Sequence, residues 1–177
     1  MAVLAAPIET TELGLVCTGP GWFVVNLSEA RWRRLEGLGA ASRPEGGIFW
    51  DQIGITVRVL GEGETLAMYH RENDQEAFLV LSGEGTLIVE GEERPLRAWD
   101  FFHCPAGTAH ALIGGPLVVV AVGARGHEIR PGTGWGEYPV DETALRHGVG
   151  VETATDDPDV AYARFGETET VPYGGWL

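Results

Sequence analysis

The sequence predicts an all-β protein built around a closed antiparallel barrel or a sandwich, and two observations carry that prediction. Short apolar runs recur over residues 48–124, and glycine or proline separates most of them. Glycine is abundant at 26 residues and proline adds 10, which is typical of many turns between short strands. At 177 residues and 44% hydrophobic, the chain can bury one substantial core, so we expect a single domain with terminal extensions.

The expected strands follow each other closely within this central region. They are IFW (48–50), ITVRVL (55–60), TLAMYH (65–70), EAFLVL (76–81), TLIVE (86–90), RPLRA (94–98), FFHC (101–104), HALI (110–113) and LVVVAV (117–122). Strands at such intervals favour a barrel or a sandwich. No repeat divides the region into two copies, so we predict one barrel over residues 46–124.

The two flanking segments are expected to pack as extensions. Residues 1–45 are predicted to form an arm, a strand at WFVVNL (22–27) and a short helix N-capped by Ser28 that ends at Gly37 or Gly39. In residues 125–177, Asp156 or Asp157 followed by Pro158 is predicted to start another short helix.

Four of the six tryptophans, Trp22, Trp32, Trp135 and Trp176, lie outside the predicted barrel. We therefore expect the extensions to bury apolar surface, either on their own barrel or on a partner subunit. A homodimer is the prediction, although packing within one chain explains the tryptophans almost as well.

Charge and the N-terminal sequence restrict the partners and the location. Twelve basic against 26 acidic residues give a formal net charge of -14, which repels phosphate backbones and anionic headgroups, so we expect neither nucleic acid nor a membrane as a partner. The N-terminus has no basic leader, and no apolar stretch approaches the roughly 20 residues of a spanning helix. A cytoplasmic protein is expected, with Cys17 and Cys104 as reduced thiols.

A polar segment immediately precedes the apolar run FLVL, in the sequence YHRENDQEAFLVL (69–81). Because side chains alternate between the two faces of a strand, His70 and Glu72 can point into one cavity. The residues NDQ (73–75) supply a turn, after which Glu76 shares its face with Phe78. If the strands flank that turn, all three polar side chains meet inside the barrel.

Two spaced motifs accompany this cluster. Glu76 is followed by six residues and Gly83, and Pro105, Gly107 and His110 form a Pro-x-Gly-x-x-His sequence. These segments resemble the two motifs of the cupin superfamily, over roughly residues 46–124. The resemblance implies a cupin-type antiparallel β-barrel, also described as a double-stranded β-helix or jelly roll, with short helical extensions.

The resemblance also implies a metal site. It assigns His70, Glu72, Glu76 and His110 as ligands of one divalent transition metal, Fe, Mn, Ni or Zn. Glu72 departs from the family pattern, because it stands where a second histidine is usual. It can be a ligand, or a carboxylate that only lies beside the metal. An alternative frame places Tyr69 and Arg71 at the histidine positions, but a cationic guanidinium does not ligate a metal.

The residues around this site have simpler interpretations. Alternation allows only one of His103 and Cys104 to face the cavity, and neither needs a function there. Tyr69, Arg71 and Asp74 are expected at the rim or on the surface. An apolar wall is expected from the following residues: Met68, Phe78, Val80, Phe102 and Leu112.

Three functions fit these expectations. The first is a metal-dependent enzyme, of the dioxygenase or isomerase type, acting on a small oxygenated organic molecule. The second is a non-catalytic module that binds or senses a small molecule, and the third is a barrel with a vacant site and a role in assembly. Few basic residues lie in the barrel segment, with Arg58, Arg71, Arg94 and Arg97 as candidates, so a phosphorylated substrate is not favoured. No helix-turn-helix segment is visible, so a transcriptional sensor is not favoured either.

Overall fold

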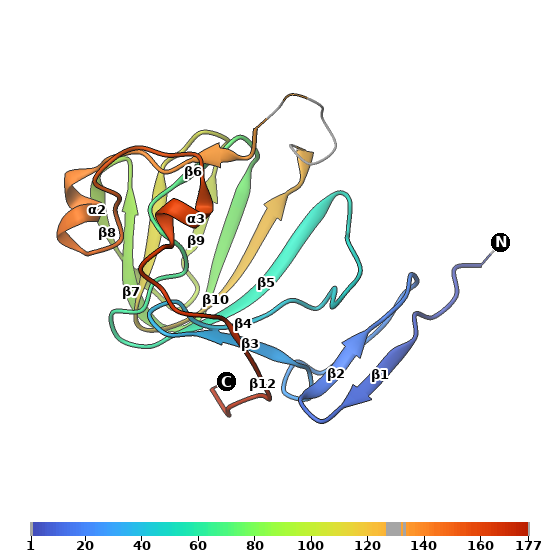
Figure 1. The fold of residues 1–177 in the computed structure, drawn as a ribbon. Coiled ribbons are helices and arrows are strands. Elements are labelled where there is room, and N and C mark those ends of the chain that lie inside the picture. Colours follow the sequence, from blue (N-terminus) through green and yellow to red (C-terminus); the bar gives the residue numbers. More distant parts are fainter. Residues whose placement is uncertain (1, 127–131, 133, 177) are drawn as a thin grey trace.

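The computed structural model describes residues 2–126, 132 and 134–176, and it is an antiparallel β structure with two short helices in those residues (Figure 1). The strands are β1 (Ile8–Thr11), β2 (Gly14–Cys17), β3 (Trp32–Leu35), β4 (Gly39–Ser42), β5 (Ile53–Leu60), β6 (Arg71–Glu72), β7 (Glu76–Val89), β8 (Glu92–Arg97), β9 (Phe101–Cys104), β10 (His110–Ala124), β11 (Gly136–Glu137) and β12 (Glu169–Val171). The helices are α2 (Glu142–Arg146) and α3 (Pro158–Ala161).

The main sheet has the order β12-β3-β4-β5-β10-β7-β8, and β9 pairs with β7 off this path. All of these pairings are antiparallel. The sheet curves around an apolar core that includes Leu60, Phe78, Val80, Leu112 and Val119. The predicted cupin-type antiparallel β-barrel with short helical elements is therefore confirmed.

Two long strands, β7 and β10, each replace a pair of predicted strands. β7 joins the runs EAFLVL and TLIVE, and β10 joins HALI and LVVVAV. Their pairing contains a register shift between Gly114 and Leu117. Gly83 lies opposite this irregularity with φ +80°, and a Cβ atom there would come within 2.1 Å of the Pro116 carbonyl oxygen. The glycines between these runs thus mark a bulge within paired strands, where the sequence suggested turns.

The expected helix after Ser28 is wrong, because residues 32–35 form β3 in place of a helical turn. Trp32 is completely buried, and its strand is paired on one side with β4 and on the other with β12. Pairing and burial outweigh the capping signal at Ser28, since helix propensity is a weak prior against tertiary packing.

Three of the expected strands are also wrong. Residues 22–27 and 48–50 contain no strand, and residues 65–70 contain only isolated bridges at Thr65 and His70. β5, β8 and β9 agree with the runs ITVRVL, RPLRA and FFHC. The segment that carries His70 is therefore held by single bridges and side-chain contacts.

The C-terminal extension packs against the same chain. The rings of Tyr173 and Trp176 lie 5.7 Å and 5.3 Å from that of Trp32, measured between centroids. The predicted helix at Pro158 is confirmed as α3, with Asp157 as its N-cap. α2 was not predicted, although Asp141 caps it by accepting a hydrogen bond from the Ala144 N–H.

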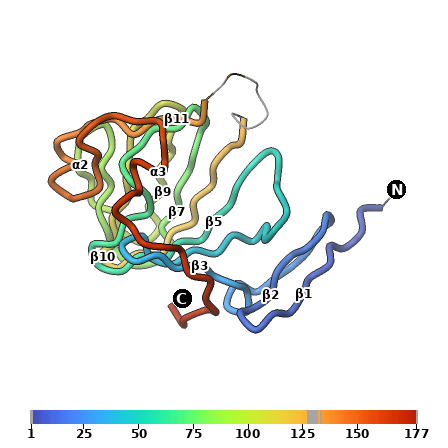
Figure 2. Tube along the Cα trace, in the orientation of Figure 1, coloured from blue at the N-terminus to red at the C-terminus, as the bar shows by residue number. Residues whose placement is uncertain are grey.

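The N-terminal hairpin β1–β2 projects from the body of the barrel, as Figure 2 shows. The side chains of β1 are all exposed. Cys17 and Cys104 are free and buried thiols, as expected. In the described part of the chain, no helix has the length and apolar character needed to span a membrane.

Candidate metal centre

Three separate segments of the chain place His70, Glu76 and His110 together inside the barrel. His70 precedes β6, Glu76 is the first residue of β7, and His110 is the first residue of β10. The backbones of the two histidines exchange hydrogen bonds of 3.1 Å and 2.8 Å in an antiparallel bridge. Residues paired in this way project to the same face, and their ring centroids lie 4.8 Å apart.

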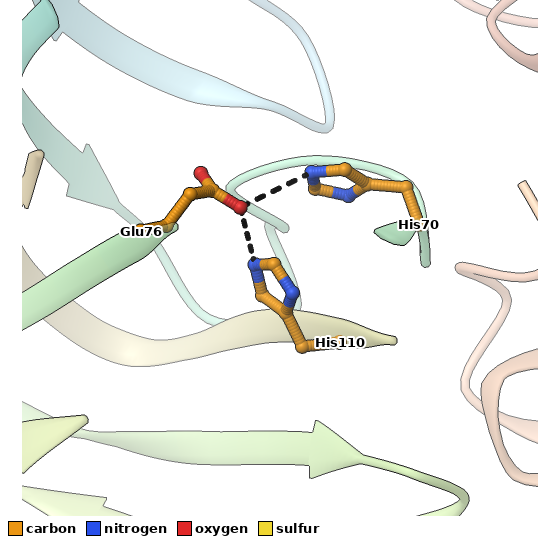
Figure 3. A group of neighbouring side chains, drawn as sticks. All are labelled: His70, Glu76 and His110. Atoms are coloured by element: carbon orange, nitrogen blue, oxygen red, sulfur yellow. Dashed lines mark ion pairs between the residues drawn. The ribbon is translucent and has the colours of Figure 1, made fainter. Parts of the chain in front are cut away.

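The donor atoms of these three side chains converge (Figure 3). Oε2 of Glu76 lies 3.9 Å from Nε2 of His70 and 3.4 Å from Nε2 of His110. One potential ligand atom from each residue lies within 4.8 Å of the others. Because bonds from nitrogen or oxygen to such a metal are about 2.1 Å long, two ligands of one ion lie up to about 4.2 Å apart. The spacing fits a single metal ion with little adjustment.

Hydrogen bonds at the far side of each ring fix which nitrogen faces the site. Nδ1 of His70 lies 2.7 Å from the Met68 carbonyl oxygen, and Nδ1 of His110 lies 3.2 Å from that of Thr108. A carbonyl oxygen only accepts, so Nδ1 carries the proton in both neutral rings. Each Nε2 atom then presents a lone pair toward Glu76, which is the arrangement that metal-binding histidines need.

Two of the converging atoms find no hydrogen-bond partner in the part of the chain that the structure describes. Among the described residues, Oε2 of Glu76 and Nε2 of His110 are buried and unsatisfied. Leaving such atoms unpaired costs about 1–3 kcal/mol each. A divalent cation between them would satisfy both at once, so the residues present fit the metal that the sequence motifs imply.

Burial shapes the protonation of the three groups in the protein without a metal. Desolvation lowers the pKa of His70. The pKa of His110 is lowered to about 3, mainly by desolvation and to a smaller extent by the nearby His70. The pKa of Glu76 is raised to about 8, mainly by desolvation and to a smaller extent by the negative charge of the neighbouring Glu72. Both imidazoles are therefore neutral at physiological pH, as ligands must be.

Glu72 lies at the edge of this group. Its Oε1 is 3.8 Å from Nε2 of His70, while the compact cluster comprises only the other three residues. The Glu72 side chain is 24% exposed, compared with 13% for Glu76 and 1% for His110. Glu72 is thus the most exposed of these side chains and lies on the solvent side of the centre.

Aromatic rings hold His110 in place. Its ring centroid lies 5.1 Å from that of Phe78 and 5.7 Å from that of Phe102, and the two phenyl rings are stacked. Cys104 is the inward member of its pair with His103, with Sγ 3.4 Å from Nδ1 of His110. Burial raises the pKa of the Cys104 thiol to about 12, so it remains protonated beside the ring.

A second aromatic group comes from the C-terminal extension and was not anticipated. The ring centroids of Trp135 and Tyr138 lie 6.3 Å and 6.1 Å from that of His70. Tyr162 continues this group, and its hydroxyl oxygen accepts a hydrogen bond from the Met68 N–H. Only the abundance of aromatic residues after position 125 hinted at this wall, since no motif spacing links them to the barrel.

Some neighbours of the site lie elsewhere than expected. Tyr69 and Asp74 are buried, in contrast to the predicted rim or surface position. The Tyr69 hydroxyl accepts from the Gly91 N–H, which explains its inward placement. Arg71 is exposed, as expected, and pairs with Glu137. Phe78, Val80, Phe102 and Leu112 form the expected apolar wall, whereas Met68 packs in a cluster with Tyr138.

Residues 56–123 match the sequence profile of the family described as "Cupin domain". This stretch contains the three clustered side chains, the barrel strands from β5 to β10 and both motifs. Residues 56–123 are therefore similar to a cupin domain.

Several solved structures are similar to parts of this chain. One from Acidithiobacillus ferrooxidans, provisionally described as a sugar phosphate isomerase, is 27% identical and has a TM-score of 0.45 over 51% of this chain and 62% of its own. A sugar phosphate isomerase from Silicibacter pomeroyi is 24% identical, with a TM-score of 0.45 over 50% and 60%. An RmlC-like cupin from Shewanella frigidimarina is 18% identical, with a TM-score of 0.45 over 52% and 81%.

The present chain thus spans about three fifths of the length of the two sugar phosphate isomerase structures. No curated protein matches the sequence.

Proposed function

We propose that this cupin is a mononuclear metal protein in which His70, Glu76 and His110 hold one divalent transition metal ion. The observation that carries the proposal is a pair of buried atoms that have no hydrogen-bond partner among the described residues, Oε2 of Glu76 and Nε2 of His110, 3.4 Å apart. Glu72 is proposed as the fourth ligand, because its carboxylate lies 3.8 Å from Nε2 of His70.

The donor set limits the identity of the metal. Two imidazoles and one or two carboxylates suit Fe, Mn, Ni or Zn, whereas Ca and Mg prefer oxygen ligands alone. The second carboxylate shifts this preference toward the harder ions of the group. It would also stabilise a higher oxidation state if the metal is redox-active.

The proposed activity is that of a metal-dependent enzyme, of the dioxygenase or isomerase type, on a small oxygenated organic molecule. When bound, such an ion supplies a Lewis acid that polarises a substrate oxygen, or a centre that accepts dioxygen. The chain itself supplies the surroundings. Glu72 is the most exposed of the four polar side chains, so substrate is expected to approach from its side.

The aromatic walls support a reaction in a largely dry site. Phe78 and Phe102 fix the ring of His110, and Trp135 and Tyr138 lie against His70. Burial is the largest cause of the raised pKa of Tyr138, so its hydroxyl stays neutral and does not compete as an anion for the metal. Limited water strengthens electrostatic effects at such a centre.

The reaction type can be tested by two assays on protein loaded with iron, manganese, nickel or zinc. Oxygen consumption with a panel of diols, thiols and aromatic polyols measures dioxygenase activity, and deuterium uptake from solvent into sugars measures isomerase activity. His110→Ala is expected to abolish either activity. His103→Ala is the matched control, because His103 is exposed on β9 and should leave turnover unchanged.

The proposed enzymatic function is supported if either assay shows substrate-dependent turnover that His110→Ala abolishes and His103→Ala retains. Saturable ligand binding to the loaded protein without turnover in either assay would replace it with a non-catalytic binding cupin.

A further inference from the structure

A cavity lies where the N-terminal segment meets β3, β4 and β5. Its volume is about 230 Å³, and none of the proposed metal ligands lines it. Five arginines line it: Arg31, Arg33, Arg34, Arg43 and Arg58. The remaining lining includes apolar side chains such as Leu15, Phe23 and Leu38. The cavity therefore combines an apolar surface with guanidinium groups.

This concentration of positive charge is unusual for the chain. All 12 of its basic residues are arginines, and its formal net charge is -14. Glu45 is the one acidic side chain among the described residues that line the cavity, and it already pairs with Arg125 at 2.7 Å. Arg34 pairs with Glu64 at 3.2 Å. Arg31, Arg33 and Arg43 have no ion pair among the described residues, so the cavity keeps an excess of positive charge.

Strand register explains how these side chains meet. Arg33 on β3 is opposite Ala41 on β4, and Ala41 is opposite Arg58 on β5. Directly paired residues share one face of a sheet. Arg31 immediately precedes β3 and Arg43 immediately follows β4, and both line the same cavity. The small Ala41 side chain leaves space between the guanidinium groups on either side.

Arg58 is partly buried, and its Nε atom is shielded from solvent. Its guanidinium donates to the carbonyl oxygens of Leu38, at 3.0 Å, and of Leu66. Its Nε–H is buried and has no partner within the described residues. Burial lowers the pKa of Arg58 to about 10, so the group is still cationic at neutral pH. Among the described residues Arg58 has no ion pair, and desolvation of such a cation is unfavourable unless an anion accompanies it.

We propose that this cavity binds a small organic anion, a carboxylate or a phosphate ester with an apolar body. Guanidinium groups recognise both kinds of anion through paired N–H donors. The volume suits a single ring with one anionic group, since benzene already fits a cavity of about 150 Å³. The site is distinct from the proposed metal centre, and its occupancy does not depend on which metal is present.

Isothermal titration calorimetry with benzoate and phenyl phosphate tests this proposal and separates its two sources of anion. Benzyl alcohol serves as the uncharged control. We expect saturable binding of at least one anion, no binding of the alcohol, and weaker binding at high salt. Absence of saturable binding for both anions, or equal binding of the alcohol, would overturn the proposal.

Two variants locate the binding site. Arg33→Gln removes an exposed charge, and Ala41→Leu fills the space between Arg33 and Arg58, so each should weaken binding roughly tenfold or more. Arg94→Gln is the matched control, because Arg94 is an exposed arginine on β8 outside the cavity. Equal loss in the control, or no loss in either cavity variant, would contradict the assignment. Metal content measured in parallel should be unchanged in all three, which separates this test from that of the metal centre.

Discussion

Nε2 of His110 and Oε2 of Glu76 face each other at 3.4 Å in the barrel, and within the described residues neither atom has a hydrogen-bond partner. His110 cannot donate to Glu76, because its ring proton is held at Nδ1 by the Thr108 carbonyl. Either a proton on Glu76 or a cation must therefore lie between the two lone pairs. The proposed metal ion would resolve this contact and would also engage His70.

The contribution of Glu72 can be separated from that of Glu76 by paired substitutions. Glu76→Gln should reduce metal affinity by more than 100-fold, since its carboxylate contacts both histidines. Glu72→Gln should reduce it less, about 10–100-fold, because Glu72 is the most exposed of the four proposed ligands and lies near His70 alone of the two histidines. Competition with a metal chelator measures both affinities. Equal losses in the two variants would instead make Glu72 a ligand of the same standing as Glu76.

In protein without a metal, the free energy of unfolding should depend on pH because Glu76 ionises. Its folded pKa is about 8 and its ordinary value is 4.5, so above pH 4.5 the unfolded chain releases a proton that the folded protein keeps. The stability that the protonated Glu76 side chain contributes is therefore fully present below pH 4.5, and it is lost as the pH rises through about 8. His110 has the opposite effect between pH 6.5 and about 3.

Between about pH 6.5 and 8, the effect of Glu76 on stability can therefore be measured without the opposite effect of His110. Urea unfolding with a chelator present should show stability falling with pH across this window. Glu76→Gln cannot ionise, so its slope should be flatter. An unchanged slope in the variant would show that Glu76 does not keep its proton in the folded protein.

Trp32 should be the main anchor of the C-terminal tail. It is completely buried and contacts Tyr173 and Trp176, so Trp32→Ala is expected to destabilise the protein by about 3–5 kcal/mol. Trp99→Ala is the control, because Trp99 is 77% exposed and its loss should cost little. Chemical denaturation compares them, and similar midpoints would contradict tail packing on the same chain.

Gly83 is predicted to be required at the bulge between β7 and β10. Gly83→Ala combines a positive φ with a Cβ only 2.1 Å from a backbone oxygen, so we expect a loss of about 2–4 kcal/mol. Gly63 also has a positive φ, of 74°, but open space around it. Gly63→Ala should cost only the strain of about 1–2 kcal/mol. If thermal unfolding shows equal losses, steric contact at Gly83 is not the cause.

The barrel and its three clustered side chains were predictable because they depend on short-range signals. Glycine spacing and apolar runs indicated the strands, and the motif residues Glu76, Gly83 and His110 indicated the site. The strand parity used for His70 and Glu72 rested on a strand that the structure does not contain at residues 65–70. His70 reaches the site through its backbone bridge to His110, a contact between positions 40 residues apart.

The structural features that could not be predicted from the sequence depend on contacts between residues far apart in the chain. Trp32 joins a strand because β12, more than 130 residues later, pairs with it. Trp135 and Tyr138 reach His70 only when the C-terminal extension folds over the barrel. The arginine-lined cavity likewise needs the register of β3, β4 and β5, which alternation within any single strand does not provide.

The central claim is tested most directly by the metal content of protein prepared without a metal-affinity tag. Elemental analysis should find about one transition metal ion per chain in the wild type and almost none in a His70→Ala, Glu76→Ala double variant that remains folded. Wild-type protein that carries no transition metal under any loading condition, or a double variant that keeps it, would contradict the proposed centre.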